Sequence, residues 1–350
     1  MKALTRSQRT VRRGGPTIYQ VAERAGVSIA TVSRVHRQAD RVAQPTRERV
    51  RRAIEELSYR PSRLGRSLAH GSHDAIGIVF PDLSGPYFST VILGYEEASS
   101  TGGRSVMILG THGRPGSVDH VLNMADRVDG LVVMSQTIGD EIVEELDRRG
   151  VPVVLLARPP AGAADSVRTE NRASAAALVG HLIEHGLRSI AFLGDPDGSA
   201  DARERWDGFL DAHRAARLEP AFEPVACGYR EVDGRAAAAR LLDRPDRPTA
   251  VVGANDEIAL GALDAARTRG IRVPDELAIT GWDDIPMSRH THPALTTVRQ
   301  PMLELGRRAA ALLDERISTN RTEPRHEVLP TELVVRSSCG CRAPTNRKEE

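Results

Sequence analysis

Apolar side chains recur at helical spacing in three short segments between residues 17 and 57. Thr17 and Gln20 form a capping box that predicts where the first helix begins, and Gly26 predicts where it ends. Ser28 caps the second helix, and Pro45 lies in the first turn of the third. The core expected between them comprises Ile18, Val21, Ala22, Ala25, Val27, Val32, Val50, Ile54 and Leu57. Two helices joined by a turn with glycine are typical of a helix-turn-helix.

Residues 62–69 have the sequence of a helix that is too short to be stable by itself. They follow an extended step at Arg60 and Pro61, and Gly65 costs a helix about 1 kcal/mol. We expect this helix to form only when a partner stabilises it. Two copies over a DNA minor groove would do so, with Leu64 packed on its counterpart and Leu68 wedged between base steps. The alternative is a plain linker.

From residue 75 onward, short β-rich runs alternate with helical segments. This alternation predicts parallel sheets with helices on both faces, which is an α/β architecture. The expected strands are residues 75–80, 105–109, 130–134, 151–156, 189–193, 250–253 and 277–280. The expected helices include residues 174–184, 202–215 and 257–267. Ligands of such sheets bind beyond the carboxyl ends of the strands.

The charge distribution changes at about the same place in the chain as the predicted secondary structure. Residues 1–70 carry 16 Lys and Arg but only 5 Asp and Glu, a net charge of +11. Since the whole chain has a net charge of +1, the other 280 residues carry −10. A basic head on an acidic body points to a polyanion that binds the head alone.

Composition narrows the class of protein further. A chain of 350 residues with 40% apolar residues is long enough for two or three folding units with a sizeable core. Its three cysteines form no disulfide framework, which fits a reducing cytoplasm. The first sixteen residues are rich in arginine and hold no apolar run, and no segment reaches the roughly 18 apolar residues of a membrane span. We therefore expect a soluble cytoplasmic protein with no membrane partner.

The second helix of the head is the expected recognition helix. In a helix-turn-helix its N-terminal end enters the major groove, where short polar side chains and arginine reach bases and phosphates. The expected DNA-binding residues are Thr17, Tyr19, Ser28, Ile29, Ala30, Thr31, Ser33, Arg34 and Leu68. The alternative is an ordinary three-helix bundle whose arginines face water. The net charge, the caps and the spacing together favour double-stranded DNA.

The chain resembles the lactose-repressor (LacI/GalR) family of bacterial transcription regulators. The motifs that carry the resemblance are TIYQVAERAGVSIATVSRV, TRERVRRAIEELSYRPS, RSLA, PDLSGPYFS, VDGLVVM, VPVVLLAR, ARERWDGF, GANDEIALGAL, RVPDELAITGWDD, LTTVRQP and LPTELVVR. They occur in the family's order from Thr17 to Ser337. Gly65 departs from the alanine usual in the family's hinge helix. Ile29 and Ala30 occupy the two positions that vary with the operator, and neither side chain can hydrogen-bond a base.

The resemblance implies an all-α helix-turn-helix head joined to a two-lobed α/β core like that of periplasmic sugar-binding proteins. Expected boundaries are a disordered basic tail at 1–16, the head at 17–61, the hinge helix and linker at 62–73, the core at 74–338 and a disordered tail at 339–350. The first lobe would take about 74–171 and 298–325, and the second 172–297 and 326–338. The family acts as homodimers on palindromic operators, and an effector that closes the lobes would move the two hinge helices and change operator affinity.

The expected effector-binding residues follow strands or lie near the crossing between the lobes. They are Asp82, Ser84, Tyr87, Phe88, Asn171, Arg205, Asn255, Trp282 and Asp283. By resemblance, Arg205, Asn255 and Asp283 contact the effector. An arginine fork, an amide and a carboxylate can hold vicinal hydroxyls, and an aromatic ring can cover a sugar. A sugar is favoured, and a nucleobase or nucleoside is the alternative.

Each of these residues also has an ordinary structural explanation. Arg205 can pair with Glu204 or Asp207 on a helix surface, and Asn255 can simply cap the following helix. Asp283, like Asp82 and Ser84, can be a turn former. The spacing alone does not exclude these alternatives.

Enzyme and metal chemistry find little support in the sequence. The segment GTHGRPG does not have the spacing of a dinucleotide-binding loop, and no GxSxG or P-loop motif is present. His290 and His292 lie in a loop without an obvious third ligand, and Cys339 and Cys341 lie in a polar tail. We expect no catalytic residues, no cofactor and no metal. A solute-binding protein of the periplasm matches the core but not the basic head.

Overall fold

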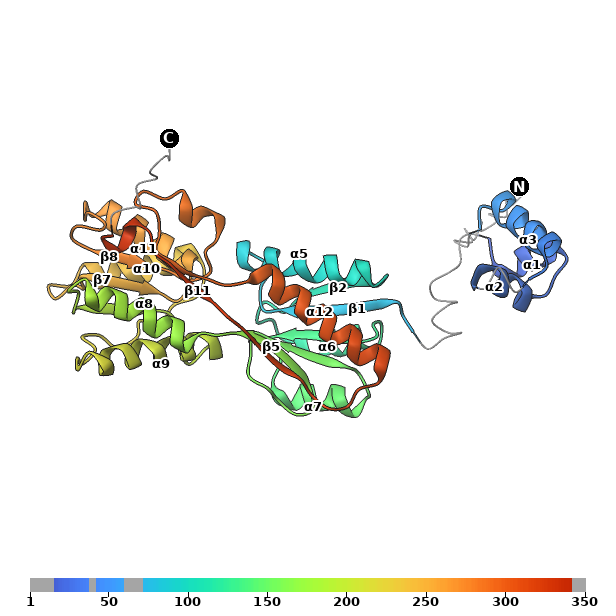
Figure 1. The fold of residues 1–350 in the computed structure, drawn as a ribbon, viewed down its shortest axis with the longest axis horizontal. Helices are drawn as coiled ribbons and strands as arrows, with labels where there is room; N and C mark the ends of the chain where they lie inside the picture. Colours follow the sequence, from blue (N-terminus) through green and yellow to red (C-terminus); the bar gives the residue numbers. More distant parts are fainter. Residues whose placement is uncertain (1–15, 38–41, 60–71, 342–350) are drawn as a thin grey trace, which may run out of the picture. The chain divides into compact units, whose positions relative to one another are not determined.

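The computed structural model describes residues 16–37, 42–59 and 72–341 (Figure 1). They form two units, divided between His73 and Asp74, and each unit is described by itself. Residues 1–15 of the expected tail at 1–16, the hinge helix with Gly65 and Leu68, and residues 342–350 lie outside the described residues. Within the described ranges, no helix is long and apolar enough to span a bilayer.

The first unit contains the three helices that the sequence predicts. They are α1 (Ile18–Ala25), α2 (Ile29–Arg37) and α3 (Gln44–Glu56). The backbone N–H of Thr17 donates to Gln20 Oε1 at 2.8 Å, and Gly26 ends α1 with a φ of 63°. The backbone N–H of Thr31 donates to Ser28 Oγ at 3.2 Å, which confirms the cap of α2. The fully buried residues Val21 and Val50 lie in a core that also contains Ala22, Ala25, Val32, Val35 and Ala53.

The second unit is built around two parallel sheets. The six-stranded sheet has the order β10-β5-β4-β3-β1-β2, and the three-stranded sheet has the order β6-β7-β8. The strands of the larger sheet are β1 (Ala75–Phe80), β2 (Ser105–Gly110), β3 (Leu131–Met134), β4 (Val153–Leu156), β5 (Asp165–Thr169) and β10 (His326–Leu329). Those of the smaller sheet are β6 (Ile190–Leu193), β7 (Ala250–Gly253) and β8 (Ala278–Thr280). We call the part built on the larger sheet the first lobe and the part built on the smaller sheet the second lobe.

Helices cover both faces of the first-lobe sheet (Figure 1). On β1, Ile76, Ile78 and Phe80 pack toward α5 (Pro86–Thr101) and α12 (Met302–Thr319). Val79 packs on the opposite face, toward α6 (Ser117–Ala125) and α7 (Asp140–Arg148). Strands that are buried on both faces need continuous apolar runs, which is why the sequence showed them clearly.

Helices of the second lobe pack in two pairs. The helix α8 (Arg172–Glu184) packs on α9 (Ala200–Ala215), and α10 (Glu231–Leu242) packs on α11 (Asp256–Thr268). With the strands they enclose one continuous core that includes Phe192, Phe209 and Trp282. All seven strands and all three helices that the sequence predicted for the second unit are present, with ends that differ by a few residues at most.

The chain passes between the lobes three times, and the crossings differ from the expected boundaries. The strand β9 (Thr297–Arg299) pairs in antiparallel fashion with β11 (Glu332–Val334), and both belong to the second lobe. The strand β10 pairs with β5 and therefore belongs to the first lobe, not to the second as expected. In Figure 1 the red segment from β10 to β11 runs from one lobe to the other. The crossings are thus at residues 170–171, 300–301 and 330–331.

Two further expectations are wrong in detail. The tail was expected to begin at residue 339, but Cys339 ends a 3₁₀ helix (Ser337–Cys339) and is only 2% exposed within the second-lobe core. The strand β5 was not predicted because its sequence is polar. It is nevertheless an inner strand between β10 and β4, and its buried Asp165 is paired with Arg316 at 3.1 Å and Arg321 at 2.6 Å.

Glycine allows α5 and α12 to approach each other closely. A Cβ atom at Gly306 would lie well inside van der Waals distance of the carbonyl oxygen of Val91, and one at Gly94 would meet the carbonyl of Leu303. These obstacles are backbone atoms, so they cannot move without separating the helices.

We predict that Gly306→Ala lowers the free energy of unfolding of the core by about 1–3 kcal/mol, because the added methyl group overpacks the contact between α5 and α12. Gly180→Ala is the matched control, since a Cβ there would meet no heavy atom within 4 Å. Alanine is favoured over glycine within a helix, so this control should gain roughly 0.5–1 kcal/mol. Urea unfolding followed by circular dichroism measures both, and equal stability of the two variants would contradict the prediction.

Candidate functional site

A cavity of about 450 Å³ opens between the two lobes of the second unit. Its walls come from the loops that follow strands and from the first turns of helices in both lobes, where a doubly wound architecture places its ligands. The first lobe contributes Pro81, Asp82, Ser84, Tyr87, Phe88, His112, Gly113, Met134, Ser135, Gln136 and Ala157. The second contributes Ser199, Asp201, Arg205, Gly228, Tyr229, Arg230, Asp233, Asn255, Glu257 and Asp283, and Gln300 lies at the crossing.

Seven of the nine expected effector-binding residues line this cavity. They are Asp82, Ser84, Tyr87, Phe88, Arg205, Asn255 and Asp283. The other two, Asn171 and Trp282, do not line it. Both are buried and contact Arg205, and a direct contact of either residue with an effector stays a prediction.

Arg205 is held in one orientation by contacts on several sides. Its Nε donates to Asn171 Oδ1 at 2.8 Å, and its Nη1 donates to the carbonyl oxygen of Ala254 at 2.6 Å. Its guanidinium carbon lies 4.5 Å from the centre of the Trp282 ring, a cation–π distance. Its side chain is 5% exposed.

The ordinary explanation for Arg205, a surface ion pair with Glu204 or Asp207, does not hold. Glu204 instead accepts from Arg168 at 2.7 Å. The acid nearest to the guanidinium is Asp201, whose Oδ2 lies 3.9 Å from Arg205 Nη2. A fixed and desolvated fork of donors at a cavity wall is suited to binding polar ligand atoms.

Asp283 is a buried carboxyl group in an unusual backbone conformation. It is 4% exposed, and its φ is 118°. Burial raises its pKa well above the usual range, while the charge of Arg205 opposes that shift. Its Oδ1 accepts from Gln300 Nε2 at 2.5 Å, and Gln300 Oε1 in turn accepts from Thr169 Oγ1 at 2.6 Å. A turn former would not need this burial, and strain of this kind gathers at functional sites.

Asn255 and Asp82 perform the structural roles that their local sequences suggest, and they also reach the cavity. Asn255 Oδ1 accepts from the backbone N–H of Ile258 at 2.8 Å and caps α11. Asp82 Oδ1 accepts from the backbone of Leu83 at 2.7 Å and of Ser84 at 3.1 Å. Burial acts to raise the pKa of Asp82, but these backbone donors lower it on balance. Both side chains therefore hold the local backbone in place and also line the cavity.

Aromatic side chains form the apolar part of the wall. The rings of Tyr87 and Phe88 meet edge to face at 5.5 Å, and Phe88 meets Phe80 in the same way at 5.8 Å. Burial, together with the charges of Asp201 and Asp283, raises the pKa of Tyr87 well above its ordinary value, so its phenol stays protonated. Tyr229 adds a third ring from the second lobe.

Several lining residues were missed by the sequence analysis. His112, Gln136 and Gln300 each lie shortly after a strand. Asp82 was predicted from the same kind of position, so this signal could have identified them as well. Asp201 and Tyr229 lie beside helix starts and carry no such signal. Burial raises the pKa of Asp201, as it does that of Asp283, so the cavity holds two carboxyl groups that resist ionisation.

In the first unit, the expected DNA-binding residues lie at the surface around the start of α2. Tyr19 is 69% exposed and Ile29 39% exposed, and Thr17, Ser28, Ala30 and Arg34 are exposed as well. Thr31 and Ser33 are half-buried. Val32 faces the opposite way, at 1% exposure, as expected. The surface thus combines Thr17 and Tyr19 at the start of α1 with Arg34 and mostly small or polar side chains at the start of α2.

Two family models match the two units. The model for bacterial regulatory proteins of the lacI family matches residues 17–62, and the model for a periplasmic binding protein-like domain matches residues 179–339. The transcriptional regulator CelR of Thermobifida fusca is 37% identical over 339 residues, which cover 93% of this chain and 99% of CelR.

Solved structures agree with these matches. The lac repressor dimer bound to its operator and the anti-inducer ONPF is similar with a TM-score of 0.82 and 29% identity, covering 93% of this chain and 99% of that one. The complex of CelR with cellobiose has a TM-score of 0.71 and 34% identity, covering 92% and 99%. From the helix-turn-helix, the two-lobed core and these matches over nearly the whole length, we conclude that the chain belongs to the LacI family of bacterial transcription regulators.

Proposed function

We propose that this protein is a cytoplasmic homodimer that binds a palindromic operator and changes its affinity for that operator when a sugar fills the cavity between the lobes. It controls transcription in this way and catalyses no reaction. The observation that carries the proposal is the cavity itself, where buried Arg205 and Asp283 face a wall of aromatic rings. The alternative effector is a nucleobase or nucleoside.

The chemistry of the cavity favours a sugar. Vicinal hydroxyl groups both donate and accept hydrogen bonds, so they match a wall that holds a guanidinium together with carboxyl groups. The rings of Tyr87 and Phe88 suit the apolar face of a pyranose or furanose. CelR, which is similar over nearly its whole length, has been solved with cellobiose. A cavity of about 450 Å³ lies within the usual range for small-molecule sites.

We propose that closure of the lobes couples effector binding in the cavity to operator binding by the helix-turn-helix. Residues from both lobes line the cavity, so a bound effector holds the lobes at one angle about the crossings. In a homodimer this movement changes the distance between the two hinge segments, in which Leu68 is the proposed wedge. Leu93 on α5 and Ile108 on the edge strand β2 are 51% and 45% exposed and offer apolar surface for a partner subunit. Operator affinity responds because each state of the lobes binds DNA differently.

We predict that Arg205→Lys weakens effector binding by about 10- to 100-fold, because lysine keeps the charge but loses the fork of donors. A thermal-shift panel of sugars and nucleosides first identifies the effector, which at 100 times its Kd should add ~2.7 kcal/mol of stability. Titration calorimetry then compares the variant with the unaltered protein.

Arg172→Lys is the control for this experiment, since Arg172 pairs with Asp211 at 2.5 Å outside the cavity. It should bind the effector within about twofold of the unaltered protein. Operator binding without effector should be retained in both variants. An unchanged effector Kd in Arg205→Lys would refute the assignment of the cavity and leave the DNA-binding proposal untouched.

For the DNA-binding surface, we predict that Arg34→Ala weakens operator binding by about 10- to 100-fold, because an exposed arginine on the recognition helix contacts a base edge or a phosphate. Selection from a random DNA pool by the full-length protein defines the operator, and fluorescence anisotropy measures the Kd. Arg24→Ala removes the same charge from α1, where Arg24 pairs with Glu56 at 2.6 Å. Similar losses in the two variants would show that charge alone, not the helix position, carries the contact.

A further inference from the structure

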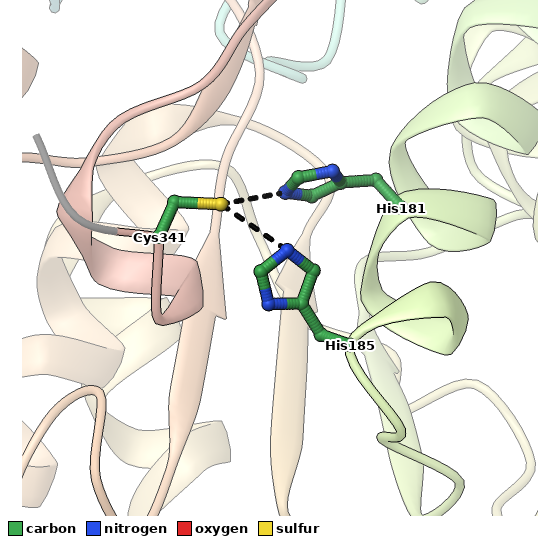
Figure 2. A group of neighbouring side chains, drawn as sticks. All are labelled: His181, His185 and Cys341. Carbon is green, nitrogen blue, oxygen red and sulfur yellow. Dashed lines mark hydrogen bonds between the residues drawn. The ribbon is translucent and has the colours of Figure 1, made fainter. Parts of the chain in front are cut away.

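Three potential metal ligands from distant parts of the chain meet at the end of α8 (Figure 2). His181 lies in the last turn of this helix and His185 is its C-cap. Cys341 is the last described residue of the chain. Its Sγ lies 3.2 Å from His185 Nε2 and 3.5 Å from His181 Nε2. The three ligand atoms all lie within 4.8 Å of one another.

Local structure explains why these side chains converge. Residues four apart lie on the same face of a helix, so His181 and His185 stand one above the other, with ring centres 4.6 Å apart. The chain end is anchored in the core, because Ser338 Oγ accepts from the backbone of Thr296 at 2.8 Å. Gly340 then turns the chain with a φ of 98°, a conformation that favours glycine. This turn brings Cys341 to the helix.

Cys339, on the other side of that turn, places a second sulfur beside the same helix. Its Sγ lies 3.3 Å from His181 Nε2. Cys339 Sγ also accepts from Thr296 Oγ1 at 3.1 Å. Two imidazoles and the Cys341 thiol therefore lie within 4.8 Å of one another, and the Cys339 thiol lies beside this group in contact with His181.

This set of donors matches the chemistry of zinc. Structural Zn²⁺ sites are tetrahedral and combine cysteine and histidine, including the Cys₂His₂ set. Bond lengths of about 2.3 Å to sulfur and 2.0–2.1 Å to nitrogen place tetrahedral ligands about 3.5 Å apart. The observed separations of sulfur and nitrogen, 3.2–3.5 Å, are close to that value.

The surroundings also suit a cation. The C-terminal end of a helix carries a partial negative charge, and these ligands lie at that end of α8. Metal ligands must be deprotonated, so Zn²⁺ would displace the protons of the thiols and convert them to thiolates.

We propose that His181, His185 and Cys341 bind Zn²⁺, with Cys339 as the fourth ligand, and that the ion fastens the end of the chain to α8. The consequence is local to the second lobe. The same helix packs on β9 and β11, next to the crossings between the lobes. The bound ion therefore stabilises the part of the core next to the crossings about which the lobes are proposed to move.

Zinc content of the untagged full-length protein, purified under reducing conditions, tests the proposal. Elemental analysis after dialysis should find about one Zn²⁺ per chain. After chelation, Co²⁺ should give the absorption of tetrahedral coordination together with a thiolate-to-cobalt charge-transfer band. Less than about a tenth of an equivalent of zinc, or a cobalt spectrum without the thiolate band, would overturn the proposal. A Cys339–Cys341 disulfide in the reduced preparation would overturn it as well.

Zinc binding by single-residue variants distinguishes the proposed ligands from residues outside the cluster. Cys341→Ser and His185→Gln should each weaken Zn²⁺ binding by at least about 10-fold. The matched controls are Cys227→Ser, a half-buried thiol outside the cluster, and His292→Gln, an exposed imidazole in a loop. Both controls should bind zinc within about twofold of the unaltered protein. Equal losses in ligands and controls would contradict the site.

His185→Cys keeps the proposal testable if a ligand variant does not fold. It replaces one zinc ligand by another, so it should retain tight binding and strengthen the thiolate-to-cobalt band. Loss of binding in a folded His185→Cys protein, shown by an unchanged circular dichroism spectrum, would contradict coordination at this position.

Discussion

The contacts of one buried guanidinium hold the cavity together. Arg205 is oriented by Asn171 at a crossing between the lobes, by the carbonyl of Ala254 after β7 and by the ring of Trp282 after β8. A desolvated charge without such partners would be strongly destabilising. Its position therefore depends on the crossing, on two strands and on α9 at once. Asp283 faces the same charge from a backbone conformation that only a packed surrounding can maintain.

The fold was predictable wherever burial on two faces demands apolar runs. The strands β1 and β7 begin and end where the sequence indicates, and the capping box at Thr17 and Gln20 marks α1 correctly. The missed strands, β5, β9, β10 and β11, are short or polar. Their stability comes from partners far along the chain, such as Arg316 and Arg321 for Asp165, and no local pattern reveals such pairs. The misplaced boundary at β10 has the same cause.

The sites were predictable to a similar extent and for similar reasons. Polar residues that directly follow strands, such as Asp82 and Asp283, line the cavity as expected. Asp201 and Tyr229 were missed because their position depends on how the second lobe packs. The contact of Trp282 with Arg205 joins residues far apart in the chain, so the sequence alone did not show it. The histidines of α8 and Cys341 are about 160 residues apart, so neither segment alone suggested a metal.

The pairing of β10 with β5 and of β11 with β9 has a consequence for synthesis of the protein. The outer strand of the first-lobe sheet and the partner of β9 both lie in the final twenty-five residues or so of the chain. Every residue that lines the cavity lies between Pro81 and Gln300, so the walls are synthesised before β10 and β11. These two strands pair with β5 and β9, which lie next to the crossings between the lobes. A nascent chain that lacks them therefore contains all the lining residues but not the strand pairs beside the crossings.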